Sequence, residues 1–196
     1  ILELVCDLTT RRRQVQEGAW QRSPVFALVE PEFEELAGHT LTVVGAGTIG
    51  RGVAAVAEAF GMVVRLITSR SSAAELEAAL RQADVICLHV PLTPATRGLI
   101  NAERLGWLKP SALLVNLGRG GLIDLPALVE ALQRGALAGA ALDVLDQEPP
   151  GAELDARKTV PNLILTPHIG WASRQARERL VAALAEALER EIGSWG

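Results

Sequence analysis

Six short apolar runs, rich in β-branched residues, alternate with stretches of helical periodicity over most of the chain. The runs lie at 40–45, 62–67, 84–90, 112–116, 138–143 and 162–166, and the helical stretches lie at 49–60, 72–82, 101–107 and 124–134. Strands separated by helices predict right-handed βαβ crossovers and a parallel sheet. Because the runs are continuously apolar, we expect both faces of the strands to be covered. The pattern predicts an α/β fold with a doubly wound parallel sheet of about six strands and helices on both faces.

The two ends of the chain depart from this alternation. Residues 1–17 have an apolar then a charged helical pattern, whereas 19–35 lack a period and contain two prolines, which predicts an extended arm. A last amphipathic helix is predicted from about residue 173 to 192. We therefore divide the chain into a helix and arm (1–35), a main domain (36–172) and a closing helix (173–196).

The composition indicates a globular protein, with 49% hydrophobic residues, 21% charged residues and a net charge of −4. No long basic run favours nucleic acid or an anionic membrane, and the cluster Arg11–Arg13 is predicted to be a solvated helix face. No apolar run approaches the ~20 residues that span a bilayer, and no metal-ligand spacing is present. Cys6 and Cys87 lie in apolar contexts, which predicts buried free thiols and a cytoplasmic location.

A glycine-rich turn follows the first predicted strand and opens a helix. Its residues are Gly45, Ala46, Gly47, Thr48, Ile49 and Gly50. Between a strand and a helix, this GxGxxG pattern predicts a Rossmann-type dinucleotide site. Gly45 permits the turn, Gly47 lets backbone N–H groups approach a pyrophosphate, and Gly50 lets the helix pack closely on the strand. The alternative is a turn that only connects the two elements.

The end of the second predicted strand bears on the choice of dinucleotide. A site for NAD carries a carboxylate about 20 residues after the glycine turn, where it binds the ribose 2′-hydroxyl. Here the run is Thr68-Ser69-Arg70-Ser71, with no acid. Hydroxyl groups and a planar cation suit a 2′-phosphate, so Ser69 and Arg70 favour NADP(H) over NAD(H). In the alternative interpretation, Arg70 points into water.

Five stretches in order and in register resemble the D-isomer-specific 2-hydroxyacid dehydrogenase family. They cover most of residues 36–182 and read VVGAGTIGRGVAAVAEAFGM (43–62), LHVPLTPATRGLI (88–100), LKPSALLVNLGRGGLID (108–124), GALAGAALDVLDQEPP (135–150) and LILTPHIGWASRQARERL (163–180). The resemblance implies an oxidoreductase that moves a hydride between a nicotinamide cofactor and a small 2-hydroxy or 2-keto acid. Within the family, the chain is most similar to glycerate dehydrogenases and hydroxypyruvate or glyoxylate reductases.

The resemblance also implies roles for individual residues. Arg119 matches the arginine that orients the substrate carboxylate, His168 matches the acid/base histidine, and Glu148 matches the glutamate that partners this histidine, with Asp146 as a nearby competitor. These residue types suit the roles, because a guanidinium binds carboxylates in a bidentate manner and an imidazole exchanges protons near neutral pH. Positions that line the cofactor match Val90, Pro91, Thr96, Leu117, Gly118, Asp143, His168 and Gly170.

Family members carry a substrate lobe that these 196 residues lack, so residues 1–35 are interpreted as a crossing helix and arm and 173–196 as a return helix. The chain is expected to begin inside a longer sequence, to bind a dinucleotide and to turn over poorly by itself. The resemblance further implies a homodimer formed through the cofactor lobe and the arm, with Leu2, Val5, Trp20, Val25 and Phe26 at the interface. A different class of function is open as well: a dinucleotide-sensing scaffold or corepressor-like module without turnover.

Overall fold

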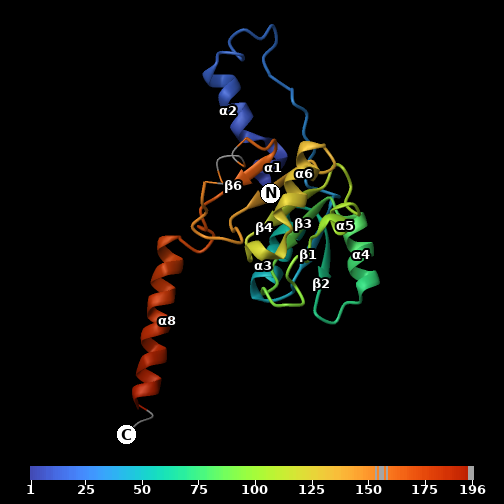
Figure 1. The fold of residues 1–196 in the computed structure, drawn as a ribbon. Helices are drawn as coiled ribbons and strands as arrows, with labels where there is room; N and C mark the ends of the chain where they lie inside the picture. The colour runs from blue at the N-terminus through green and yellow to red at the C-terminus, as the bar shows by residue number, and fades with distance from the viewer. Residues whose placement is uncertain (153, 155–156, 158, 194–196) are drawn as a thin grey trace.

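The computed structural model describes residues 1–152, 154, 157 and 159–193. Its centre is a six-stranded parallel sheet with the strand order β2-β1-β3-β4-β5-β6 (Figure 1). The strands are β1 (Thr40–Val44), β2 (Val63–Ile67), β3 (Val85–Leu88), β4 (Leu113–Asn116), β5 (Gly139–Leu142) and β6 (Leu163–Leu165). Each strand falls within the run predicted for it. The direction of the strand order reverses between β1 and β3, which is where doubly wound sheets bind ligands.

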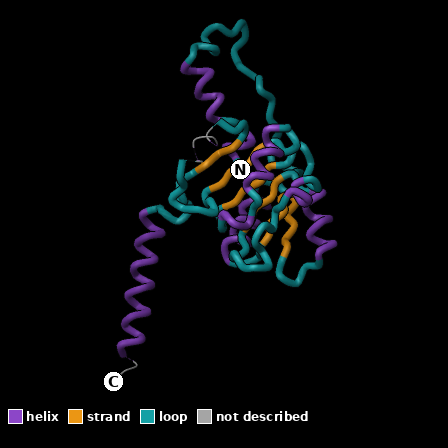
Figure 2. Tube along the Cα trace, viewed as in Figure 1, coloured by secondary structure: helices purple, strands orange, loops and turns teal. Residues whose placement is uncertain are grey.

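Helices cover both faces of the sheet, which confirms the predicted fold class. On one face, α1 (Leu2–Cys6) and α3 (Thr48–Ala59) contribute to a cluster with Leu41, Val43 and Cys87. On the other face lie α4 (Ala73–Gln82), α5 (Ala102–Leu105), α6 (Leu125–Gln133) and the short 3₁₀ turn η1 (Gly120–Leu122). Figure 2 shows the strands of the sheet among the surrounding helices.

Side-chain caps explain where several of these helices begin. Ser72 and Glu75 form a reciprocal capping box at the start of α4. Asn101 accepts a hydrogen bond from the Arg104 N–H at α5, and Asp124 accepts one from the Ala127 N–H at α6. Each cap satisfies a backbone donor that the first helical turn leaves without a partner.

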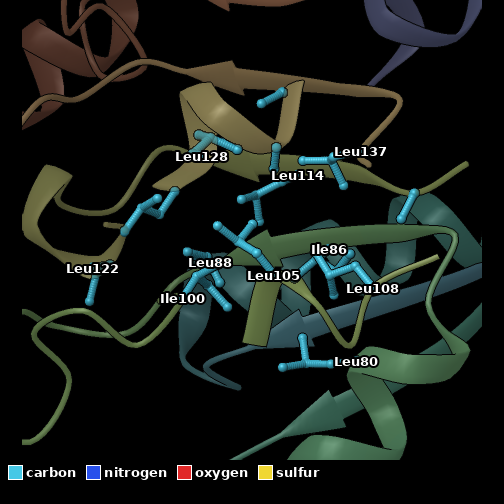
Figure 3. Close-up of a cluster of buried hydrophobic side chains, with 14 of the residues drawn as sticks. Leu80, Ile86, Leu88, Ile100, Leu105, Leu108, Leu114, Leu122, Leu128 and Leu137 are labelled. Carbon is cyan, nitrogen blue, oxygen red and sulfur yellow. The ribbon is translucent and has the colours of Figure 1, made fainter. Parts of the chain in front are cut away.

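Leucine and isoleucine side chains make up most of the larger of the two core clusters (Figure 3). Leu80, Ile86, Leu88, Leu114 and Leu128 are completely inaccessible to solvent. Full burial of such a side chain contributes about 1.5–3 kcal/mol of transfer free energy. This core supports the strand ends from which the site loops emerge.

Several expectations need correction. Strand β2 is not covered on both faces, because it is the edge of the sheet; Val63 is 51% exposed and Leu66 is 40% exposed. The predicted first helix is divided into α1 and α2 (Leu8–Gln16) by Asp7, which adopts a left-handed φ of 44° and accepts a hydrogen bond from the Thr10 N–H. Cys6 is only half buried, at the end of α1.

Arg11 also differs from the expected solvated helix face. Its guanidinium donates to the carbonyl oxygens of Leu28, Glu30 and Pro31, and it lies 5.3 Å from the centre of the Phe33 ring. It therefore fastens the arm to α2, whereas Arg12 and Arg13 are exposed as predicted.

The arm and the last helix both extend away from the sheet, as Figure 1 shows. Helix α8 (Arg174–Gly193) has no buried residue, and its apolar side chains are exposed at Leu180, Leu184 and Leu188. The last three residues of the predicted segment 173–196 lie outside the described residues. Among the described residues, no helix combines the length and apolar character needed to cross a bilayer.

Candidate active site

Six loops with predicted site residues leave the carboxyl ends of parallel strands. They follow β1 (the glycine turn, 45–50), β2 (68–71), β3 (89–97), β4 (the Arg119 loop, 117–120), β5 (143–148) and β6 (the His168 loop, 166–170). Because all strands run in the same direction, these loops emerge together at the edge of the sheet that the carboxyl ends of the strands form. This edge is where α/β proteins bind their ligands.

Two glycines of the glycine turn lie where the fold leaves no room for a side chain, and a third lies where it does. Gly45 has a φ of 109°, and a Cβ there would lie 2.4 Å from the carbonyl oxygen of His89. A Cβ on Gly50 would lie 1.9 Å from the carbonyl oxygen of Gly45. Gly47, with a φ of −74°, could carry a Cβ that meets no atom within 4 Å. Packing explains Gly45 and Gly50 but does not explain Gly47, where the chain leaves open space.

The open space at Gly47 lies where an anionic group would be bound favourably. Gly47 is the N-cap of α3, and Thr48 and Ile49, the first residues of the helix, are exposed. Free backbone N–H groups and the helix dipole favour a phosphate at such a helix start. The residues present therefore fit the pyrophosphate of a dinucleotide.

His168 and Glu148 form a hydrogen-bonded pair, although they lie on different loops. His168 Nδ1 is 2.6 Å from Glu148 Oε2, and the second carboxylate oxygen, Oε1, accepts from the Leu145 N–H at 2.7 Å. Partial burial disfavours the charged carboxylate, but the hydrogen bonds from Leu145 and His168 outweigh it and lower the pKa of Glu148. Asp146, the alternative partner, contacts Arg97 instead.

Asp143 binds the loop residues before and after His168. Its carboxylate accepts from the Thr166 hydroxyl at 2.5 Å, the Ile169 N–H at 2.9 Å and the Gly170 N–H at 2.7 Å. Burial opposes ionisation of Asp143, yet these bonds keep its pKa below the ordinary value. His168 has a left-handed φ of 53°, which is costly for a residue with a Cβ. The bonds to Asp143 offset that cost and fix the direction of the imidazole.

Asn116 organises the Arg119 loop in a similar way. This fully buried side chain ends β4, donates to the Arg119 carbonyl oxygen at 2.9 Å and accepts from the Gly118 N–H at 3.0 Å. The Arg119 side chain is exposed, and its Nη1 donates to the Gly118 carbonyl oxygen. Among the described residues, no hydrogen bond joins the side chains of Arg119 and His168. The signal for Asn116, which sequence reasoning missed, is a polar residue that ends a buried apolar strand.

The other predicted cofactor residues lie around the same edge. Leu117 is 48% exposed and passes close to Gly170, where a Cβ would lie 3.3 Å from Leu117 Cδ2. Val90 and Pro91 follow β3, and Thr96 closes their loop by donating to the Pro91 carbonyl oxygen at 2.7 Å. An apolar pocket of about 270 Å³ adjoins the His168–Glu148 pair and is bounded by Asp143, Leu145, Pro149, Leu165 and Pro167.

The turn after β2 presents two polar side chains to solvent. Thr68 Oγ1 accepts from the Arg70 N–H, and Ser71 Oγ accepts from the Thr68 N–H, so both hydroxyls fold the turn on itself. Ser69 and Arg70 are exposed, and their turn follows Ile67, whose carbonyl oxygen accepts from the Gly45 N–H of the glycine turn at 2.8 Å. Neither this turn nor the rest of the described chain contains a cluster of His, Cys, Asp or Glu arranged to hold a metal ion.

Comparison with known proteins identifies the family. Residues 1–170 match the family described as "D-isomer specific 2-hydroxyacid dehydrogenase, NAD binding domain". The chain belongs to this family. It carries the family's NAD(P)-binding domain, which confirms the resemblance inferred from the motifs.

Individual relatives agree with this assignment. The chain is 42% identical to the glycerate dehydrogenase of Methylorubrum extorquens over 178 residues, which cover 89% of this chain and 57% of the relative. It is 39% identical to the glyoxylate reductase of Pyrococcus furiosus, over 91% of this chain and 54% of the relative. The D-lactate dehydrogenase of Aquifex aeolicus, solved with NAD and lactic acid, superposes with a TM-score of 0.86 at 30% identity, over 98% of this chain and 63% of that structure. The chain thus spans somewhat more than half the length of these dehydrogenases.

Proposed function

We propose that the chain is the cofactor lobe of an oxidoreductase that transfers a hydride between a nicotinamide cofactor and a small 2-hydroxy or 2-keto acid. The observation that carries this proposal is the His168–Glu148 pair, with its 2.6 Å contact, at the same sheet edge as the glycine turn. Family membership supports the reaction type. The names of the two relatives support glycerate or glyoxylate as the substrate, and hydroxypyruvate is the 2-keto acid that corresponds to glycerate.

The mechanism assigns one task to each polar side chain. When bound, the nicotinamide ring supplies or accepts the hydride. His168 donates a proton from Nε2 to the substrate carbonyl oxygen during reduction and removes it during oxidation. Glu148 holds Nδ1, which fixes the direction of the ring. The Arg119 guanidinium, whose backbone is held by Asn116, binds the substrate carboxylate and polarises the adjacent carbonyl group.

The preferred cofactor in this proposal is NADP(H). The exposed Ser69 hydroxyl and Arg70 guanidinium supply hydrogen-bond donors and a positive charge for a 2′-phosphate. Replacing Arg70 with alanine is expected to weaken NADPH binding about tenfold or more and to leave NADH binding nearly unchanged. A variant that loses affinity for both cofactors equally would contradict the proposed role of Arg70.

The substrate lobe in this proposal lies outside the 196 residues, as the coverage of the relatives suggests. The reaction is therefore tested in a protein that includes both lobes, by following substrate-dependent oxidation of NADPH. His168→Ala is expected to abolish turnover and to preserve cofactor affinity. If the complete protein binds the cofactor but reduces no member of a panel of 2-keto acids, a sensing role replaces the enzymatic one.

The proposed assembly is a homodimer formed through the cofactor lobe. The arm exposes Trp20, Val25 and Phe26, the last of which is 92% exposed. Burial of these side chains between two copies would remove a large apolar surface from water. Light scattering is expected to give the mass of a dimer, and a monomer at micromolar concentration would contradict the proposal.

A further inference from the structure

An ion pair between Arg97 and Asp146 joins two of the loops at the candidate active site. Arg97 Nη1 lies 3.2 Å from Asp146 Oδ1 and 3.4 Å from Oδ2, and the two residues are 49 positions apart in the chain. Arg97 belongs to the loop after β3, and Asp146 belongs to the loop after β5. Neither residue forms a hydrogen bond or ion pair with His168 or Glu148 among the described residues, and the mechanism described above does not use them.

The backbone that follows Arg119 passes against this ion pair. A Cβ on Gly121 would lie 2.8 Å from Asp146 Oδ1 and 3.0 Å from Arg97 Nη1. A Cβ on Gly120 would lie 1.9 Å from the carbonyl carbon of Leu145. The Gly98 N–H donates to the Gly121 carbonyl oxygen at 2.8 Å. Segments of the loops after β3, β4 and β5 are therefore packed together at this point. The Arg97–Asp146 ion pair lies against Gly121 in the segment that follows the Arg119 loop.

Asp146 also lies inside the turn that carries Glu148. The Leu145 N–H donates to Glu148 Oε1, which closes residues 145–148 into a turn (the Glu148 turn) around Asp146. The ion pair with Arg97 at Asp146 therefore restricts the position of the whole Glu148 turn. Through Glu148, it also limits where the His168 ring can lie.

We propose that Arg97 and Asp146 are positioning residues that hold the Glu148 turn against the Arg119 loop, so that the guanidinium and the imidazole keep a fixed separation. The inference rests on the proposed function, which gives Arg119 and His168 their roles. Both side chains of the ion pair are more than half exposed. Such a pair contributes little to global stability, so its effect is on loop geometry and not on folding.

The test is the variant Asp146→Asn in the 196-residue chain, because charge and geometry predict opposite results. The charged groups that act on Glu148 are His168 and Asp143, and Asp146 lies two positions away in the same turn, paired with Arg97. By charge alone, removal of a neighbouring carboxylate lowers the pKa of Glu148 further. If the turn loosens, Glu148 loses the hydrogen bond from Leu145 and its pKa rises instead. The measurement is a pH titration of the Glu148 side-chain carboxyl carbon by ¹³C NMR.

We expect the pKa of Glu148 to rise by about half a unit or more in Asp146→Asn. Asp146→Glu, which keeps the anion, is expected to restore most of the original value. Glu130→Gln removes an anion from an ion pair of similar exposure on α6 and serves as the matched control, with no expected change. A fall in the pKa of Glu148, or no rise, in a variant that unfolds at the same denaturant concentration as the parent overturns the proposal.

A cofactor titration of the same variants separates this inference from the proposed function. If NADPH and NADH both fail to bind any variant or the parent while the carboxyl pKa still rises, the proposed function fails and the positioning role stands. If the cofactor binds and the pKa does not rise, the positioning role fails alone.

Discussion

The replacement Asp143→Asn tests how the His168 loop is held in place. Asp143 is 5% exposed, and its carboxylate accepts three hydrogen bonds, from Thr166, Ile169 and Gly170. An asparagine of the same shape retains only one oxygen. Its amide nitrogen would face a donor that the carboxylate now accepts, such as the Gly170 N–H, whose nitrogen lies 2.7 Å away.

The expected cost follows from the bonds that are lost. A hydrogen bond to a charged group contributes about 1.5–3 kcal/mol, and the asparagine loses at least one of them. We therefore expect the free energy of unfolding to fall by about 2 kcal/mol at neutral pH. For a domain of this size, that corresponds to a decrease in melting temperature of roughly 4–8 °C.

The pH dependence gives the prediction a sign that can be checked. The pKa of Asp143 is lower in the folded state, because its three hydrogen bonds outweigh the effect of burial. Its contribution to stability is therefore fully present above the unfolded pKa of about 3.9 and is lost as pH falls through the folded pKa. The stability difference between Asp143→Asn and the parent should shrink steadily below about pH 4.

The assay is urea unfolding of the parent and variant at several pH values, monitored by tryptophan fluorescence. Asp146→Asn is the control, because the same chemical change at an exposed ion pair should alter stability little. An Asp143→Asn variant as stable as the parent at pH 7, or a stability difference that does not diminish in acid, would refute the reasoning.

Three further predictions concern other parts of the site. Gly47→Ala should change the unfolding free energy by less than about 1 kcal/mol but weaken dinucleotide binding in calorimetry. Gly50→Ala should lower the unfolding free energy by about 1–3 kcal/mol, because the added methyl group overpacks the turn. Equal destabilisation by the two variants would contradict the different space at the two positions. Asn116→Leu should lower the unfolding free energy by about 2 kcal/mol or more in urea, because the Gly118 N–H loses its acceptor; parental stability would argue against this role. Burial raises the pKa of Cys87 to about 12, so an aromatic disulfide reagent should label the half-buried Cys6 first and Cys87 only after unfolding; rapid native labelling of both thiols would be inconsistent with this burial.

The fold could be predicted because its signals are local. Each apolar run contains its own strand, and the glycine turn marks the passage from β1 into α3. The family followed from several motifs in register, and the match over residues 1–170 confirms it. The exposure of β2 could not be predicted in this way, because the runs do not reveal which strand becomes the edge of the sheet.

The candidate site was predicted less completely. The motifs identified Arg119, Glu148 and His168, whose catalytic roles stay predictions, but they did not indicate what holds these residues. Asn116 forms hydrogen bonds with residues two and three positions further along the chain. Arg97 and Asp146 are 49 positions apart, so their contact depends on how the loops pack and cannot be predicted from a local pattern. For the same reason, the hydrogen bonds that the His168 loop donates to Asp143 were not evident from the resemblance that placed Asp143 at the cofactor.

The most direct test of the central claim is a titration of the ¹⁵N-labelled chain with NADPH, followed by backbone amide chemical shifts. The account predicts saturable binding, with the largest shifts in the glycine turn, at Ser69 and Arg70, and in the loops around Leu117 and Gly170. NADH should produce the same pattern with weaker binding and smaller shifts near Arg70. No saturable shifts with either cofactor, or shifts confined to the opposite edge of the sheet, would contradict the account.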